Sequence, residues 1–374
     1  MQSSLDANDS QDMFSDGLDR YLRSRSGDIP SAIGAIPSRI WNDLAEMGVM
    51  GLSVSEEFGG VDSARHLCAA MEILGRHLLN PSGIIAAVMG SRLLRAAAPG
   101  SCGTLLPQLA EGAMRLAVAD GWNFDTAPES LHATADGSGF VLNGIARQVV
   151  RGDVAEQILI SCALAGNPAG RQMLFLFSAD ELRDQIEDFR LIDGSFGSLI
   201  RFPNTRVAAA CLIAEDAGDA IDDAMAWGLL CLCWEATGAM SRLLDMTTSY
   251  AKTRRQFGVP IGSFQALQHM MVDMLVHNEL ARDASLLAAT HLEATDRIEK
   301  RTAFASAKFQ IGQSAKFVRE RAVQIHGAIG MTDEIDVTKL FRRLMVIEQT
   351  FGSSDDHMET LIGTGFERHS ASDG

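Results

Sequence analysis

Apolar residues recur at helical spacing in the first third of the chain. They lie three or four positions apart between residues 38 and 48 and again between 64 and 75, at Trp41, Leu44, Met47, Leu67, Ala70, Met71 and Leu74. We expect Ser38 to cap the first of these helices and Gly48 to follow its end. Residues 1–112 therefore predict an N-terminal helical domain.

The pattern changes between residues 113 and 218. Short β-prone runs occur there at 116–119, 140–142, 157–162 and 173–177, separated by clusters of Gly, Asp, Asn and Pro. The stretch ATADGSGFVLNG at 133–144 predicts a hairpin around Asp136 and Gly137. We expect a small middle β domain, built as a barrel or sandwich, between two helical domains.

Helical spacing returns after residue 219 and continues to the end of the chain. Two apolar stripes consist of Phe264, Leu267, Met271, Met274 and Leu275, and of Phe304, Ala307, Ile311, Ala315, Val318 and Ala322. Long stripes of this kind are typical of antiparallel helices, so residues 219–374 predict a C-terminal four-helix bundle. The acidic run EDAGDAIDD at 215–223 is expected to be the linker into it. The predicted fold class is α+β.

Composition narrows the possible functions. The chain has 48 acidic and 32 basic residues, a formal net charge of −16, which argues against non-specific nucleic-acid binding. The six cysteines form no zinc-ligand set with histidine, so we expect buried thiols and no metal. The polar, acidic N-terminus resembles no targeting peptide, and no apolar run approaches the ~20 residues of a membrane span. We therefore expect a cytoplasmic protein.

Two segments carry a recognisable motif. The first is Y250–AKTRRQFGVPIGSFQALQ–268, and the second is Q324–IHGAIGMTDEIDVTKLFRRLMVIEQTFGSS–354. They resemble the R-x-x-F-G-x-x-x-x-x-x-Q and Q-x-x-G-G-x-G-x-x-x-E motifs of the acyl-CoA dehydrogenase family, with Ala328 in place of the second glycine. Weaker matches at 44–60, 105–112 and 140–144 extend the resemblance over nearly the whole chain. Within this family, the chain is similar to the small (β) subunit of heteromeric enzymes such as pimeloyl-CoA dehydrogenase.

The resemblance implies that these motifs bind the ADP half of FAD across a subunit interface. Arg254 would contact phosphate oxygens, Phe257 would cover the nucleotide, and Gln265 would donate a hydrogen bond. Gln324 and Gly327 would allow the backbone to approach the ribose and diphosphate, where a side chain would interfere. These five residues are the predicted cofactor-binding positions.

The family removes the α-proton of an acyl-CoA thioester with a glutamate, and this chain departs from that pattern. Gapless counting from Gly327 places Phe351 at the usual base position and Arg342 at the family's arginine. Counting back from Gly238 places Gly228 and Leu229 at the alternative base and its arginine. No catalytic residue is therefore predicted. Glu235 is a weak candidate for a displaced base. The alternative is that Glu235 is a structural acid, and we then expect Glu235→Gln to cost little stability.

The part of the sequence that would hold the flavin ring also departs from the family. The usual T-E-P-x-x-G-S-D loop is replaced by AVADGWNFDT at 117–126, with Asp120 near the threonine position. The strand that usually backs the ring has Gln148, Val149 and Val150. The chain thus keeps the motifs that help a neighbour hold FAD and lacks those that would hold its own flavin ring.

The sequence therefore predicts a non-catalytic, FAD-sharing subunit of an α2β2 acyl-CoA dehydrogenase. The implied partners are an acyl-CoA substrate, a larger dehydrogenase subunit that supplies the base, and electron-transfer flavoprotein as electron acceptor. Related branches degrade fatty acids or steroid side chains, but no residue here identifies the acyl group. Two alternatives stay open: a self-sufficient homomeric dehydrogenase that uses Glu235, and a flavin-free scaffold subunit.

Overall fold

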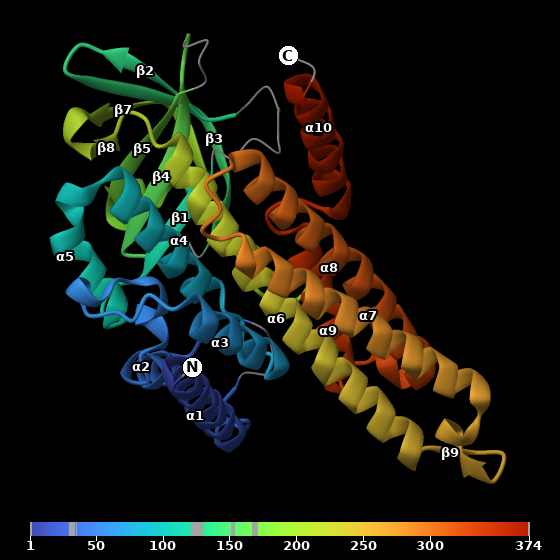
Figure 1. Cartoon of the computed structure of the whole chain (residues 1–374). Coiled ribbons are helices and arrows are strands. Elements are labelled where there is room, and N and C mark those ends of the chain that lie inside the picture. The colour runs from blue at the N-terminus through green and yellow to red at the C-terminus, as the bar shows by residue number, and fades with distance from the viewer. Residues whose placement is uncertain are drawn as a thin grey trace.

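The structure is a computed structural model that describes residues 2–29, 34, 36–120, 130–150, 154–166 and 171–372. Within these ranges, the side chains of 2–10, 120, 148–150 and 365–372 are not described. The chain forms a helical N-terminal part, a middle β sheet and a C-terminal helical bundle (Figure 1), which confirms the predicted α+β class. No helix in the described ranges is long and apolar enough to cross a membrane.

The N-terminal part packs its helices beside the sheet and the bundle. Its elements are α1 (Gln2–Ser24), α2 (Ser38–Glu46), η1 (Val49–Ser53), η2 (Glu56–Phe58), α3 (Ala64–Arg76), α4 (Ser82–Ala97) and α5 (Pro99–Ala110). The apolar positions that predicted α3 are buried in it. The prediction for Ser38 was wrong, because Pro37 is the N-cap of α2 and no side chain caps that helix.

The middle part is one eight-stranded sheet with the order β6-β7-β3-β1-β4-β5-β8, and β2 pairs with β3 and β4. Its elements are β1 (Leu116–Asp120), β2 (His132–Asp136), β3 (Gly139–Val150), β4 (Gln157–Leu164), β5 (Gln172–Ser178), η3 (Ala179–Gln185), β6 (Ile186–Arg190), β7 (Phe196–Ala208), η4 (Ala209–Cys211) and β8 (Leu212–Ala214). The hairpin predicted around Gly137 is present between β2 and β3. Strand β7, the longest, was not predicted.

Both faces of β1 are buried, and the two cores follow from strand alternation. Leu116 and Val118 of β1 belong to the core shared with the helices, whereas Ala117 and Ala119 belong to a second core within the β part. Successive side chains of a strand point to opposite faces, so one strand serves both cores. The sheet is therefore anchored to the helical parts by alternate residues.

The C-terminal part is an antiparallel bundle with a small hairpin at its far end (Figure 1). Its elements are α6 (Gly218–Thr253), β9 (Arg255–Gln256), β10 (Val259–Pro260), η5 (Ile261–Ser263), α7 (Gln265–Thr290), α8 (Arg297–His326), η6 (Gly327–Met331), α9 (Asp336–Gln349) and α10 (Ser354–Ser372). The predicted stripe on α8 is buried throughout. The predicted linker at 215–223 is largely helical, because α6 already begins at Gly218.

Helices α3 and α6 cross at two glycines. A Cβ added at Gly238 would lie 1.9 Å from the carbonyl oxygen of Glu72, and one added at Gly75 would lie 2.1 Å from that of Glu235. Contacts this short are impossible for a real Cβ, so the two backbones approach more closely than any side chain permits. This crossing sets the distance between the N-terminal part and the bundle.

We predict that Gly238→Ala destabilises the protein by about 1–3 kcal/mol or more, because the methyl group must push α3 and α6 apart. The matched control is Gly100→Ala in α5, where an added Cβ meets nothing within 4 Å. Chemical denaturation of both variants measures the difference. Equal stability of the two variants would contradict the close crossing.

Candidate functional site

The first motif forms the hairpin at the far end of the bundle. Strands β9 and β10 are joined by Phe257 and Gly258, whose φ angles are +54° and +84°. Two positive φ values define the turn that suits the twist of a two-residue hairpin, although they are unfavourable for phenylalanine. The Phe257 ring lies T-shaped against the Phe264 ring, at a centroid distance of 6.2 Å, and its side chain is 92% exposed.

The second motif lies at the same end of the bundle, because α6 and α8 meet there. The Tyr250 ring stacks on His326 with 4.4 Å between ring centroids. Arg254 follows Tyr250 by one helical turn, and Gly327 directly follows His326 as the C-cap of α8. Segments far apart in sequence are therefore brought together beside the hairpin.

All five predicted cofactor-binding residues are exposed at this end of the bundle: Arg254, Phe257, Gln265, Gln324 and Gly327. Gly327 has φ +66° and ψ −144°, a backbone conformation that only glycine adopts readily. A Cβ there would meet nothing within 4 Å, so internal packing does not require a glycine at this position. The glycine is required by the backbone conformation, and it leaves the surface open. We call this surface the bundle-end cradle.

The two family base positions meet in the interior. A Cβ at Gly228 would lie 3.1 Å from Cε2 of Phe351 and 2.8 Å from the sulfur of Met89. Phe351 is only 2% exposed, so its ring occupies the space beside the glycine. The two positions inferred by counting, one on α6 and one in the turn between α9 and α10, are therefore in contact, and neither carries a carboxylate.

The turn that carries Phe351 is held by two buried side chains, those of His357 and Lys308. Phe351 has φ +56°, an unfavourable value for a bulky residue, and its carbonyl accepts a hydrogen bond from Nε2 of His357 at 2.9 Å. Nζ of Lys308 donates to the carbonyls of Glu348 and Gly352 at 2.9 and 2.8 Å. Burial lowers the pKa of Lys308 to about 8 and that of His357 to about 4. These contacts fix the strained turn.

Glu235 is engaged in a buried ion pair. Its two carboxylate oxygens accept hydrogen bonds from Nε and Nη2 of Arg343 at 2.6 and 3.0 Å. Nη1 of the same guanidinium donates to Asp193, in the turn between β6 and β7, at 3.1 Å. Burial lowers the pKa of Arg343, but the carboxylates of Glu235 and Asp193 together raise it more. The pKa of Arg343 is therefore above its ordinary value. Burial also raises the pKa of Glu235 against the attraction of Arg343.

A raised carboxyl pKa often marks a catalytic base, but here the geometry points to a structural acid. Both oxygens of Glu235 face Arg343, so neither is directed at a substrate. Glu235 could be named from the sequence, but Arg343 and Asp193 could not, because neither lies near it in the chain. The same holds for Lys308 and His357. The sequence shows two adjacent arginines at 342 and 343, but only the structure shows that Arg342 pairs with Asp333 at the surface.

The residues expected to face a flavin ring lie outside the described part of the structure. This holds for the side chains of Asp120, Gln148, Val149 and Val150, and for residues 121–126 altogether.

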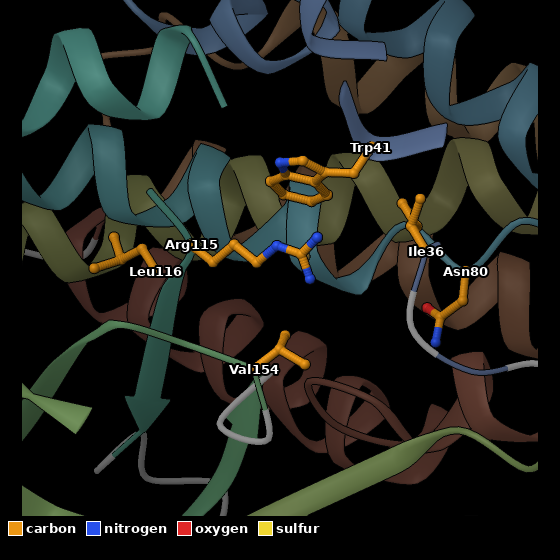
Figure 2. A pocket seen from close by; sticks show the side chains of 7 residues that line it. Ile36, Trp41, Asn80, Arg115, Leu116 and Val154 are labelled. Atoms are coloured by element: carbon orange, nitrogen blue, oxygen red, sulfur yellow. The ribbon is translucent and has the colours of Figure 1, made fainter. Parts of the chain in front are cut away.

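A small cavity between α2, α4 and β1 is not a substrate site. It has a volume of about 10 Å³, roughly that of one water molecule, and Figure 2 shows Trp41, Asn80 and Arg115 around it. The Arg115 guanidinium lies 4.7 Å from the centre of the Trp41 ring. Nδ2 of Asn80 is buried and has no hydrogen-bond partner in the described structure. The cavity is far too small for an acyl chain or a flavin.

Family models match both helical parts. Residues 8–113 match the N-terminal domain of acyl-CoA dehydrogenases, and residues 204–364 match the C-terminal domain. The chain therefore belongs to the acyl-CoA dehydrogenase family. Members bind FAD and act as oxidoreductases on the CH–CH bond of acyl-CoA thioesters.

Individual relatives are distant but cover most of the chain. A probable acyl-CoA dehydrogenase of Bacillus subtilis, YngJ, is 26% identical over 342 residues, which span 86% of this chain and 88% of that protein. The mitochondrial isovaleryl-CoA dehydrogenase of Oryza sativa is 25% identical, over 94% of this chain and 90% of that protein.

Two solved structures of similar fold are complexes of two different proteins. A chain of the Tcur3481–Tcur3483 steroid ACAD (acyl-CoA dehydrogenase) G363A variant has a TM-score of 0.77 and 25% identity, and the match covers 96% of both chains. A chain of the ChsE4–ChsE5 complex of Mycobacterium tuberculosis has a TM-score of 0.80 and 22% identity over 98% of both chains.

The buried ion pair of Glu235 with Arg343 changes the expectation that Glu235→Gln costs little stability. We now predict a loss of about 3–5 kcal/mol in the free energy of unfolding, because Arg343 would keep its buried charge with Asp193 alone to balance it. The control is Asp180→Asn, which breaks an exposed pair with Arg183 and should cost less than about 1 kcal/mol. A loss as small as the control's would show that the pair is dispensable.

Proposed function

We propose that this chain is the non-catalytic, FAD-sharing subunit of a heteromeric acyl-CoA dehydrogenase, in which both positions for the base carry residues that cannot accept a proton. The observation that carries the proposal is the contact between Gly228 and Phe351. A proton acceptor must reach the substrate α-carbon, and neither glycine nor phenylalanine can accept a proton. The partner subunit would supply the glutamate.

The bundle-end cradle supports a share in FAD binding. Arg254 offers a guanidinium suited to phosphate oxygens, Gln265 and Gln324 offer amide donors, and Phe257 offers an exposed ring. The open backbone at Gly327 allows close approach of a diphosphate. When bound, FAD would accept the hydride that leaves the substrate β-carbon. This chain would hold the ADP half, while the partner would hold the ring and the acyl-CoA.

The outer face of α7 supports association with another chain. Six large apolar side chains are exposed along it: Val272, Leu275, Val276, Leu280, Leu286 and Leu287. An exposed apolar stripe of this length is typical of an interface. The cradle begins at the N-terminal end of the same helix, at Gln265, so both surfaces can face neighbouring subunits.

Charge on α7 favours a partner different from this chain. The exposed charged side chains of the helix are the acids Asp273, Glu279 and Asp283, while Arg282 is half-buried against Glu72. A two-fold contact between copies would bring the acidic sets together, which is unfavourable. A chain with basic residues around its own apolar face avoids this repulsion. The two-protein complexes of similar fold agree with such an assembly.

The two rival functions lack a supporting observation. A homomeric enzyme with Glu235 as base would need that carboxylate free, but Arg343 holds both of its oxygens. A flavin-free scaffold would have no use for an exposed arginine and a glycine of unusual φ at the same end of the bundle. We propose electron-transfer flavoprotein as the acceptor of the assembled enzyme. The acyl group stays unassigned.

The first test of the function is flavin content. We predict that the chain purified alone carries little FAD, and that co-expression with a family member that has an intact glutamate gives a complex with bound FAD and acyl-CoA dehydrogenase activity. Absorbance of the flavin per protein chain and bleaching on addition of acyl-CoA are the measurements. A yellow homomer with about one FAD per chain that is active on acyl-CoA would refute the proposal.

A second test addresses the cradle in the assembled enzyme. Arg254→Ala should weaken FAD binding by roughly ten- to a hundredfold, since a charge-assisted hydrogen bond to a phosphate contributes about 1.5–3 kcal/mol. Arg39→Ala, at an exposed arginine of α2, is the matched control and should leave FAD affinity unchanged. FAD dissociation constants of the reconstituted apo-complexes give the comparison. Equal affinities for the two variants would remove Arg254 from the site.

A further inference from the structure

A groove separate from the cradle lies between the N-terminal part and the bundle. It has a volume of about 670 Å³ and is lined by residues of α1 and the turn after it, the end of α3, the middle of α6 and the start of α9. This volume is within the range of small-molecule sites, about 300–1,000 Å³, which favour domain boundaries. The lining residues are Asp19, Arg23, Ser26, Ile29, Arg76, His77, Leu78, Arg242, Asp336 and Lys339.

The lining is cationic on a chain that is strongly anionic. Four permanent cations, from Arg23, Arg76, Arg242 and Lys339, face two carboxylates, from Asp19 and Asp336, which leaves a lining charge of 4 − 2 = +2. The whole chain has a formal net charge of −16. A concave surface whose sign opposes that of the molecule concentrates anions locally.

Three of the four cations have acidic partners that a ligand can replace. Arg23 pairs with Asp19, Lys339 with Asp336, and Arg76 with Asp245. Each pair has at least one substantially exposed member, and exposed pairs contribute at most about 1 kcal/mol. Arg242 is exposed, and no ion pair or hydrogen bond to a described residue engages its guanidinium. It is the natural first contact for an anion.

The start of α9 adds partial positive charge at the same place. Asp336 is the first residue of this 14-residue helix, and no side chain caps its N-terminus. The first backbone N–H groups of a helix lack partners inside the helix and favour an anion. The groove therefore combines side-chain cations from four helices with a helix N-terminus.

We infer that this groove binds a small molecule with two or more phosphate groups, at a site distinct from that for FAD and independent of the proposed function. A single phosphate would occupy only a small part of the volume. No Phe, Tyr or Trp is among the described lining residues, so recognition rests on the charged groups and not on stacking with a base. The simplest member of the class is a diphosphate.

Calorimetric titration of the full chain with inorganic pyrophosphate at low salt tests the inference. We expect saturable binding that Arg242→Gln weakens by roughly tenfold or more and that the Arg242→Gln, Lys339→Gln double variant abolishes. Arg183→Gln, at an exposed arginine of η3, is the control and should bind as the wild type does. Both target side chains lie at the surface of the groove, and thermal unfolding checks that the variants are folded.

Arg254→Ala separates this site from the cradle. Pyrophosphate binding that persists in Arg254→Ala supports the groove, and binding that disappears there assigns the anion to the cradle and overturns the inference. Equal affinity in wild type and the double variant, or no saturation in the millimolar range, would indicate an adventitious ion only. None of these outcomes depends on FAD content, so the proposed function and the groove can fail separately.

Discussion

The buried guanidinium of Arg343 is the constraint on which the arrangement of the three parts depends. It joins Glu235 of α6 and Asp193 of the sheet from its own position on α9. Moving any one of these elements would leave a charge buried without its partner, which costs several kcal/mol. The crossing of α3 and α6 at Gly75 and Gly238 lies beside the same glutamate. One buried network therefore fixes bundle, sheet and N-terminal helices together.

The same contact engages the acid that the sequence offers as a candidate for a displaced base. Glu235 has a carboxylate and a raised pKa, but its charge is committed to Arg343. Two turns earlier on α6, Gly228 makes room for the Phe351 ring. The two substitutions complement each other sterically, since a larger residue at 228 would collide with that ring. Lys308 and His357 hold the turn that places the Phe351 ring beside Gly228.

The surface shows the opposite trend. The bundle end keeps an exposed arginine, two glutamines, an exposed phenylalanine and a glycine at unusual φ, none of which the monomer needs for its own packing. The outer face of α7 exposes apolar residues that no described part of this chain covers. A filled interior and exposed polar and apolar side chains at the surface are expected of a subunit that contributes to a site shared with another chain.

Local pattern in the sequence determined the order of helical, β and helical parts, the α8 core stripe, the β2–β3 hairpin and the positions that correspond to the family's motifs. These features depend on residues close in the chain, where spacing alone predicts which side chains share a face. Tertiary structure decided the rest. The stripe predicted from Phe264 to Leu275 is buried at Met274 but partly exposed at both ends, because the bundle covers only one side of α7. The partner of Glu235 lies 108 residues away, and the contact of Gly228 with Phe351 joins α6 to the turn between α9 and α10, which no local pattern relates. Whether an acid is a base or half of an ion pair depends on what packing brings to it.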